Sequence, residues 1–477
     1  MIKRFVQLLS IICCFSCQEN GLFFEDAYII HDINLIDPVD GLVNNQTVVV
    51  KGNKILNIYN TKEISLSPKN KIYNGSNKFL IPGLWDAHVH FAFEKDLAKS
   101  MNNLFIYHGI TSLRDTGGPF DFVNQFKQEA LKNPKIKSRL KIAGPLLDGK
   151  FNVYDGSDHN HPVLSIKNID ETELKKNVEF LVENKVDFLK AYEMLSSKQF
   201  ELLTELSKKY KLKLTGHVPL SMDVIAASNL GLNSIEHFRN VELSMTNLAE
   251  ELLEERKNLL INKPSLSGAK LRSLLHAKQR MRAIYSLDSS KIKKVANILS
   301  KNDTWQIPTL ELYKNFALKN YKQPEYLSSL SLLPEDIESI WRKRIKGISK
   351  DLNVQMKDFT NWSSSMVKFM HERGITFMAG TDTPIGFLIP GLSLHQEIEE
   401  FYKSGLSHLE ALKTATTNPS KYFDLQDSLG RIKPNYIADL IVLDKNPLIE
   451  IKNTRKIRAV IKDGFYMNRK FLDSIIE

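Results

Sequence analysis

Residues 79–90 read Phe79-Leu80-Ile81-Pro82-Gly83-Leu84-Trp85-Asp86-Ala87-His88-Val89-His90, and the rest of the chain is organised around them. An apolar run arrives at Pro82-Gly83 and ends in a His-x-His pair. Side chains two apart on a strand point to the same side, so His88 and His90 can reach one metal ion together. Imidazole is the commonest metal ligand among side chains. The stretch therefore predicts a metal site at the end of an apolar strand.

The composition indicates a folded protein with more than one domain. The chain has 477 residues, of which 42% are hydrophobic, and its formal net charge is +10. This length exceeds one average domain, and the hydrophobic content excludes a disordered chain. Lys and Arg are spread along the whole length, without a basic block interleaved with aromatic residues. We therefore expect a large barrel with a smaller domain beside it, and no nucleic-acid partner.

The first twenty residues have the pattern of a targeting segment. Lys3 and Arg4 precede an apolar core at residues 5–15, which is too short to span a bilayer. The pair Ser16-Cys17 resembles a bacterial lipobox, in which Cys17 is lipidated, although Cys14 stands where that pattern prefers Leu. The lipobox predicts a signal peptide at residues 1–17 and a periplasmic or outer-membrane lipoprotein of a bacterium, attached to the membrane by a lipid anchor. An ordinary cleaved signal peptide is the alternative, and it also predicts export.

Both ends of the remaining chain read as short strands separated by turns. Residues 27–73 contain β-branched runs between turn residues, and residues 438–464 have the same character. We therefore predict one composite β-sandwich domain built from residues 20–80 and 430–477. All three cysteines lie within residues 13–17, so disulfides cannot hold the mature body together.

Residues 81–429 alternate strand-like and helical runs, which favours a parallel barrel. Counted from Leu84, eight strands are predicted, and residues 375–382 form the eighth. Residues 241–300 and 327–370 are longer than a single crossover needs, and their apolar residues have helical spacing. They are predicted to be helical insertions that cover the barrel as a lid. The fold class is thus α/β, a (β/α)8 TIM-type barrel with a small flanking β-sandwich domain.

Active sites of such barrels lie at the carboxyl ends of the strands. Beyond His88 and His90, these positions carry Lys190 on strand four, His217 on strand five, His237 on strand six and Asp382 on strand eight. Two divalent ions close together need neutral imidazoles and an anionic bridge. We therefore predict that His88, His90 and Asp382 hold one ion and that His217 and His237 hold the other. Lys190 snorkelling at a strand end, and core roles for His217 and His237, are the structural alternatives.

Two motifs resemble those of the amidohydrolase superfamily, metal-dependent hydrolases built on a (β/α)8 barrel. One is the Pro-Gly-Leu-x-Asp-Ala-His-x-His signature at residues 82–90. The other, at residues 188–192, is similar to the lysine motif of the prolidase-like and imidazolonepropionase-like branch. The resemblance implies two divalent ions, zinc by preference, and carbon dioxide bound as a carbamate on Lys190 that bridges them. It also implies a metal-bridging hydroxide as nucleophile, with Asp382 as general base and acid.

The resemblance further implies cleavage of C–N amide bonds in a small-molecule substrate, a dipeptide or an N-acyl amino acid. A lactonase, or a hydrolase of the cyclic-amide or deaminase type, is the alternative within the superfamily. Lys190 argues against deaminases, which usually use one metal and lack the bridging lysine. A non-catalytic, surface-anchored binding lipoprotein is the alternative from another class, and the intact ligand set argues against it. Whether the chain forms a homo-oligomer stays open.

Three further side chains are weaker candidates. Tyr192, two residues after Lys190, can hydrogen-bond the substrate or the tetrahedral oxygen, although core packing explains it equally well. Arg239 can pair with a substrate carboxylate, or it can be a surface residue. His161, in a second His-x-His pair within a polar loop, favours a substrate or surface role over a metal. Arg114 and Asp115 are predicted to pair structurally, and His276 joins the histidines left as background.

Overall fold

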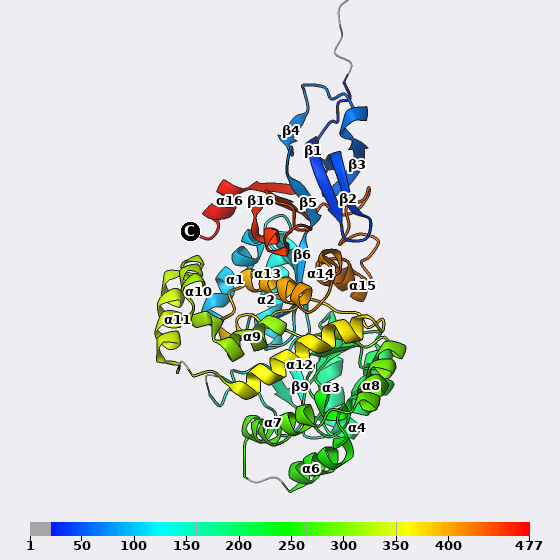
Figure 1. Ribbon diagram of the computed structural model, residues 1–477, viewed down its shortest axis with the longest axis vertical. Coiled ribbons are helices and arrows are strands. Elements are labelled where there is room, and N and C mark those ends of the chain that lie inside the picture. Colours follow the sequence, from blue (N-terminus) through cyan, green and yellow to red (C-terminus); the bar gives the residue numbers. More distant parts are fainter. Residues whose placement is uncertain (1–20, 159, 263–264, 350) are drawn as a thin grey trace, which may run out of the picture.

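The computed structural model describes residues 21–158, 160–262, 265–349 and 351–477. The predicted signal peptide, with Cys17, and His159 lie outside these residues. A β domain stands at one end of the molecule, and a larger body of strands surrounded by helices makes up the rest (Figure 1). Within the described part of the chain, no helix is long and apolar enough to span a membrane.

The β domain is one hydrogen-bonded sheet that gathers strands from both ends of the chain. Its order is β17-β16-β15-β5-β1-β2-β3, and β4 pairs with β1. The strands are β1 (Ala27–Asp37), β2 (Gly41–Lys51), β3 (Lys54–Asn60), β4 (Lys71–Asn74), β5 (Phe79–Pro82), β15 (Leu440–Leu443), β16 (Ile457–Lys462) and β17 (Phe465–Asn468).

Strand β5 joins the two ends of the chain. Leu80 lies opposite Leu35 of β1 in a parallel pair and opposite Val442 of β15 in an antiparallel pair. The β-branched residues of these strands have one face to bury, and a hydrophobic cluster containing Ile33 and Ile461 fills that side. The chain enters the barrel directly from β5, so the β domain fixes where the first barrel strand begins.

The barrel strands run parallel. One set is β6 (Leu84–Val89), β7 (Ile110–Asp115) and β8 (Arg139–Ile142). The other set is β9 (Leu146–Asp148), β11 (Phe188–Ala191), β12 (Lys213–Gly216), β13 (Ser234–Glu236) and β14 (Trp305–Ile307), with β10 (Ser165–Lys167) at its edge. The third barrel strand is broken between β8 and β9 at Gly144, whose φ is +74°. The two sets join where Asp187 N donates to Ile142 O at 2.9 Å.

Residues 376–382 close the barrel, although they form isolated bridges rather than a continuous ladder. On one side this segment exchanges backbone hydrogen bonds of 3.0 Å with Gln306 of β14. On the other side, Ala379 O accepts a hydrogen bond from Ala87 N at 2.8 Å. Asp382 N donates one to His88 O of β6 at 2.7 Å. Gly380 permits this approach, because a Cβ there would lie 2.7 Å from the Cβ of His88. The predicted barrel with a flanking β domain is confirmed, with an irregular eighth strand.

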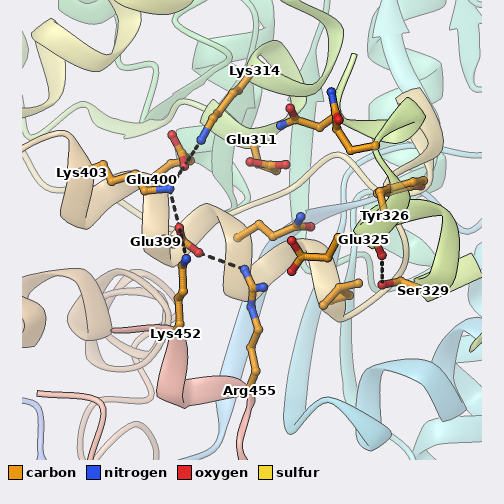
Figure 2. Close-up of a pocket in the computed structure, with 14 residues that line it drawn as sticks. Glu311, Lys314, Glu325, Tyr326, Ser329, Glu399, Glu400, Lys403, Lys452 and Arg455 are labelled. Atoms are coloured by element: carbon orange, nitrogen blue, oxygen red, sulfur yellow. Dashed lines mark hydrogen bonds and ion pairs between the residues drawn. The ribbon is translucent and has the colours of Figure 1, made fainter. Parts of the chain in front are cut away.

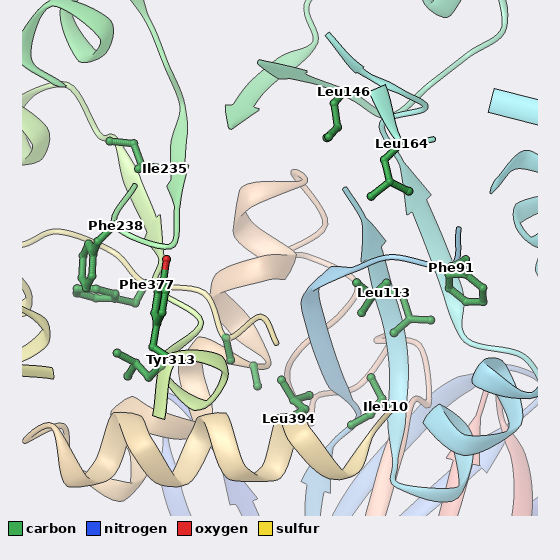
Figure 3. Close-up of a cluster of buried hydrophobic side chains, with 14 of the residues drawn as sticks. Phe91, Ile110, Leu113, Leu146, Leu164, Ile235, Phe238, Tyr313, Phe377 and Leu394 are labelled. Carbon is green, nitrogen blue, oxygen red and sulfur yellow. The ribbon is translucent and has the colours of Figure 1, made fainter. Parts of the chain in front are cut away.

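Helices surround the barrel as amphipathic crossovers, and four more pack near the C-terminus. They are α1 (Lys95–Tyr107), α2 (Phe120–Lys132), α3 (Glu171–Glu183), α4 (Ser197–Lys209), α5 (Val224–Leu230), α8 (Ser289–Lys301), α12 (Val354–His371), α13 (Leu392–Lys403), α14 (His408–Thr414), α15 (Thr417–Tyr422) and α16 (Arg469–Ser474). Their apolar faces and the strands form one continuous core, part of which Figure 3 shows around Leu113, Ile235 and Phe377. Burial of this apolar surface is the main force that holds the strand ends in place.

Both predicted insertions are helical. After β13 the chain forms η2 (Glu242–Ser244), α6 (Ala249–Ile261) and α7 (Gly268–Tyr285) before α8. After β14 it forms α9 (Leu310–Leu318), η3 (Asn320–Lys322), α10 (Pro324–Ser329), η4 (Leu330–Leu332) and α11 (Glu335–Gly347) before α12. The short 3-10 turns η1 (Thr61–Glu63), η5 (Ile385–Phe387) and η6 (Ile451–Arg455) complete the elements.

Candidate metal centre

Three predicted ligands meet at the carboxyl end of β6. His88 Nε2 and His90 Nε2 lie 3.3 Å apart, and Asp382 Oδ1 lies 3.0 Å from the first and 3.1 Å from the second. All three side chains are buried. The close approach of His88 and Asp382 follows directly from the hydrogen bond between their backbones that closes the barrel.

The second predicted pair lies beside this group. The rings of His217 and His237 have centroids 5.0 Å apart, and the His237 ring lies 4.7 Å from that of His88. His237 Nε2 is 3.8 Å from Asp382 Oδ2, so the two oxygens of one carboxylate face both histidine groups. The structure thus brings together His88, His90, His217, His237 and Asp382 from four strand ends.

The hydrogen bonds of the outer ring nitrogens fix the tautomers of three histidines. His90 Nδ1 lies 2.9 Å from Gly117 O, a carbonyl that can only accept. His217 Nδ1 lies 2.9 Å from the Glu193 carboxylate, which also accepts. His237 Nδ1 lies 2.7 Å from Thr309 Oγ1, whose proton is directed to Pro308 O at 2.8 Å. Each Nδ1 therefore carries the proton, and each Nε2 presents a lone pair to the centre, as metal-ligating histidines do.

The charge state of the group fits a cation. Burial lowers the pKa of His88 and His237 well below the usual range and lowers that of His217 to about 3, so these imidazoles are neutral. His237, with its proton on Nδ1, thus turns an unprotonated Nε2 toward Asp382 Oδ2 at 3.8 Å, an arrangement that repels until a cation lies between. In the described part of the chain, Asp382 Oδ1 and His88 Nδ1 are buried without a hydrogen bond. The donor set therefore fits a divalent ion of the kind that prefers nitrogen and oxygen ligands.

Lys190 lies beside the same group, where its Nζ contacts Glu236. Glu236 is fully buried, and its carboxylate also accepts a hydrogen bond from Arg114 Nη2 at 2.8 Å. Burial, and next Arg114, lowers the pKa of Lys190 well below the usual range. His217 Nε2 lies 4.0 Å from the same Glu236 oxygen that Lys190 contacts, so the two side chains face one buried carboxylate.

The comparisons with known proteins concern one segment of the sequence and the overall fold. A family model described as the amidohydrolase family matches residues 361–466. A Xaa-Pro dipeptidase solved with methionine bound in its active site aligns with a TM-score of 0.67 at 17% identity, covering 93% of this chain and 100% of that chain. The bottromycin amidohydrolase aligns with a TM-score of 0.69 at 18% identity, covering 94% of this chain and 89% of that one.

Over residues 361–466, the sequence thus matches the family that its motifs resemble. The ochratoxinase of Aspergillus niger is 38% identical over 88 residues, a segment that covers 18% of this chain and 18% of that protein. The aligned segment thus spans less than a fifth of this relative. At 17–18% identity, the two structural matches establish a shared fold and not a shared substrate.

Two residues beside the metal-ligand group, Glu236 and His276, were missed from the sequence. Glu236 forms, with His88 and His237, a second group whose ligand atoms lie within 4.8 Å of one another. Neighbours on a regular strand point to opposite sides, but the positive φ of His237, 61°, breaks that alternation and turns both side chains inward. His276, treated as background, reaches Glu193 from α7 with Nε2 2.9 Å from the carboxylate.

The predicted pairing of Arg114 with Asp115 is wrong. Arg114 points toward Glu236, whereas Asp115 accepts from Phe91 N at 2.8 Å and from Gly117 N at 3.1 Å. The reason is the same alternation of side chains along β7. Asp115 therefore fixes the loops that follow β6 and β7, and burial raises its pKa to about 6.

The three weaker candidates lie at different depths. Tyr192 is buried with its ring 4.4 Å from that of His217, and Arg239 Nε lies 3.7 Å from Glu193. His161 remains in its loop, with Nδ1 2.9 Å from Asp158. Tyr154 connects His161 to Tyr192, because its ring centroid lies 5.6 Å from the His161 ring and 5.9 Å from the Tyr192 ring.

A separate polar pocket of about 230 Å³ lies between α9, α13 and η6 (Figure 2). Ion pairs line it, among them Glu400 with Lys314 at 2.5 Å and Glu399 with Arg455 at 3.0 Å. Buried Glu311 also lines it, and burial raises the pKa of that carboxyl to about 8. This pocket shares no residue with the metal-ligand group, so we assign the chemistry to the strand ends.

Proposed function

We propose that this protein is a metal-dependent hydrolase that cleaves the C–N amide bond of dipeptides or N-acyl amino acids. The observation that carries the proposal is the convergence of His88, His90 and His237 Nε2 atoms on the Asp382 carboxylate, with the outer nitrogens of His90 and His237 held by acceptors. The superfamily supports hydrolysis of amides, and a Xaa-Pro dipeptidase is among the structures of similar fold.

The proposed metal site has two halves. His88, His90 and Asp382 would hold one divalent ion, and His217 and His237 the other, with zinc the expected metal. Lys190, carboxylated by carbon dioxide, would supply the bridging anion. When bound, such ions polarise a carbonyl oxygen and lower the pKa of water toward neutrality.

The chain's own residues would then move the protons and hold the substrate. Asp382 takes a proton from the attacking water and returns it to the leaving amine, because its two oxygens face both histidine groups. Tyr192 accepts a hydrogen bond from Arg272 Nη1 at 3.1 Å, which leaves its own proton free for the substrate oxygen. Arg239 offers a guanidinium to a substrate carboxylate, and His161 contacts the outer part of the substrate.

The test is metal quantification on carefully prepared protein, followed by a screen of dipeptides and N-acyl amino acids. We expect two divalent ions per chain and release of a free amino acid. Lys190→Ala should lose most activity, and an added short carboxylic acid should restore part of it. At most one ion per chain, with Lys190 unmodified in a crystal structure, would defeat the two-metal site, and a screen without turnover would defeat amide hydrolysis.

We also propose that the protein is exported and lipidated at Cys17. Lys3, Arg4 and the short apolar core before Ser16-Cys17 support this proposal. Radiolabelled palmitate should enter the wild-type chain in a bacterial host, and Cys17→Ser should leave an unlipidated precursor. Wild-type chain without label would refute lipidation, whereas export is read separately from fractionation of the cells.

A further inference from the structure

Two arginines share one buried carboxylate beside the metal-ligand group. Glu193 is fully buried, and its carboxylate lies 3.7 Å from Arg239 Nε and 3.9 Å from Arg272 Nη1. His276 also contacts it, but burial lowers the pKa of that imidazole to about 3, so it adds no charge. Two guanidinium groups against one carboxylate leave one positive charge in excess at this point.

The excess charge has unused hydrogen-bonding capacity. Among the described residues, Arg239 Nε is buried and has no hydrogen-bond partner. An unpaired buried guanidinium N–H is costly, and a ligand acceptor would remove that cost. The Arg239 and Arg272 side chains remain 16% and 13% exposed, whereas that of Glu193 is 0% exposed. Solvent therefore reaches both arginines, whereas the carboxylate that they share is closed to it.

Helix α7 brings Arg272 to this position from the insertion after β13. A Cβ on Gly268, the first residue of the helix, would overlap the backbone oxygen of Phe151, so the helix start packs directly on the loop after β9. Further along, His276 lies 2.9 Å from Glu193. Arg272 extends between these two contacts, with its guanidinium 5.7 Å from the Tyr154 ring centre.

Tyr192 connects the arginines to the metal ligands. Its hydroxyl accepts from Arg272 Nη1 at 3.1 Å, and its ring lies 4.4 Å from the ring of His217. In a dipeptide or N-acyl amino acid, the free carboxylate is separated from the scissile carbonyl by the amide nitrogen and the α-carbon alone. A carboxylate held by the arginines therefore leaves the carbonyl within reach of the histidine group.

We propose that Arg272 and Arg239 form the subsite for the free carboxylate of the substrate, and that α7 is the element that makes the enzyme require this charge. The inference rests on the proposed amide hydrolysis and names the substrate's recognised end. Guanidinium groups are suited to it, because their planar N–H forks match a carboxylate in paired hydrogen bonds.

The test measures binding without turnover on the metal-loaded full-length protein. The probes are N-methanesulfonyl derivatives of L-alanine, L-leucine, L-phenylalanine and L-proline, in which a sulfonyl group replaces the scissile carbonyl. Each is titrated calorimetrically as the free acid and as the carboxamide. Arg272→Gln is compared with Arg282→Gln, a change on the same helix at a partly exposed arginine that pairs with Glu251 and Glu255.

We expect wild type and Arg282→Gln to prefer at least one acid over its carboxamide, and Arg272→Gln to bind that acid about 10- to 100-fold more weakly. Arg272→Lys keeps the charge without the fork and should recover part of the loss, which separates recognition from a folding defect. Lack of any preference in wild type, or an unchanged preference in Arg272→Gln, would overturn the subsite. Acid binding that depends on Arg272, in a protein that hydrolyses no amide, would instead refute the proposed function and leave an anion site.

Discussion

At the scale of single residues, the outer contacts of the metal centre decide its chemistry. The Nδ1 atoms of His90, His237 and His217 each donate one hydrogen bond. The acceptors are a backbone carbonyl, a threonine hydroxyl and a carboxylate, in that order. Such contacts set both the tautomer and the ring orientation of a ligating histidine. The rings are therefore oriented toward the centre before any cation binds, and under the proposed function Asp382 is the carboxylate that transfers the proton.

The first prediction separates proton transfer from metal binding at Asp382. Asp382→Asn keeps an oxygen near His88 and His90, so we expect the protein to fold and to retain at least one ion. Loss of a positioned proton shuttle costs about 10²–10⁴ in rate, so kcat should fall by that factor. The acidic limb of the pH–rate profile should change with it, because that limb reports coupled groups rather than one residue.

Asp427→Asn, at an exposed aspartate, is the matched control and should keep both the rate and the metal content. Metal is measured by elemental analysis and folding by circular dichroism. If Asp382→Asn hydrolyses its substrate at the wild-type rate, Asp382 is not the proton shuttle and the histidine group serves another purpose.

Single residues also show where prediction from sequence ends. His88, His90, Lys190, His217 and His237 could be found because each follows an apolar run, and parallel strands end at one edge of the barrel. Glu236 could not, because a positive φ at the next residue places it on a side that strand alternation assigns elsewhere. His276 lies about forty residues beyond β13 in the sequence, and no local pattern tells where a helix in an insertion will pack.

At the scale of elements, α7 is a part of the insertion that contacts residues beside the predicted metal ligands. Its start packs on the loop after β9 through Gly268, and its middle reaches Glu193 through His276. The residues between these contacts face Tyr192 and Tyr154. The helix thus both covers the site and contributes to it, which is why a change at its first residue should have consequences at a distance.

The second prediction concerns that first residue. Alanine normally favours a helix over glycine, by about 0.5–1 kcal/mol. Gly268→Ala should instead destabilise the protein, by about 1–3 kcal/mol, because the added methyl overlaps Phe151 and Asn152 backbone oxygens. Urea denaturation measures this loss, and limited proteolysis should cleave the α6–α7 insertion more readily.

Gly347→Ala is its control, because nothing lies within 4 Å of a Cβ at that helical position. That variant should be neutral or slightly more stable. Equal stability of the two variants would mean that the contact between α7 and the loop after β9 does not hold the helix.

At the scale of the whole molecule, the barrel stands on a sheet that only the two chain ends together can make. Strand β5 receives β1 on one side and β15 on the other, so neither terminal segment completes the sheet alone. The composition of the ends allowed this sheet to be predicted, since both are rich in β-branched runs between turns. The irregular eighth barrel strand could not be foreseen, because its course depends on how closely Gly380 approaches His88.

The third prediction tests this joint at Asp37, the last residue of β1. Arg431 Nη2 donates to its carboxylate at 2.8 Å, and Ile432 N donates at 3.0 Å, so a contact across 394 residues ties the start of the chain to its end. Removing one partner of a mostly buried pair leaves the other unsatisfied. Asp37→Asn should therefore lower the free energy of unfolding by about 1–3 kcal/mol at pH 7, measured by urea denaturation.

The same pair predicts the pH dependence of this loss. Burial alone would raise the pKa of Asp37, but the hydrogen bonds from Arg431 and the backbone lower it below the usual value. The folded pKa thus lies below the unfolded one, which is about 3.9. The carboxylate then contributes its full stability above about pH 4, and this contribution is lost as the pH falls through the folded pKa. The difference in unfolding free energy between wild type and Asp37→Asn should narrow accordingly from pH 7 to pH 3.

Asp40→Asn is the control, because the Asp40 carboxylate also contacts Arg431 but is half-exposed. This change should lower the free energy of unfolding by less than about 1 kcal/mol. A gap that stays constant across this range would show that Asp37 acts through its shape in the turn and not through its charge.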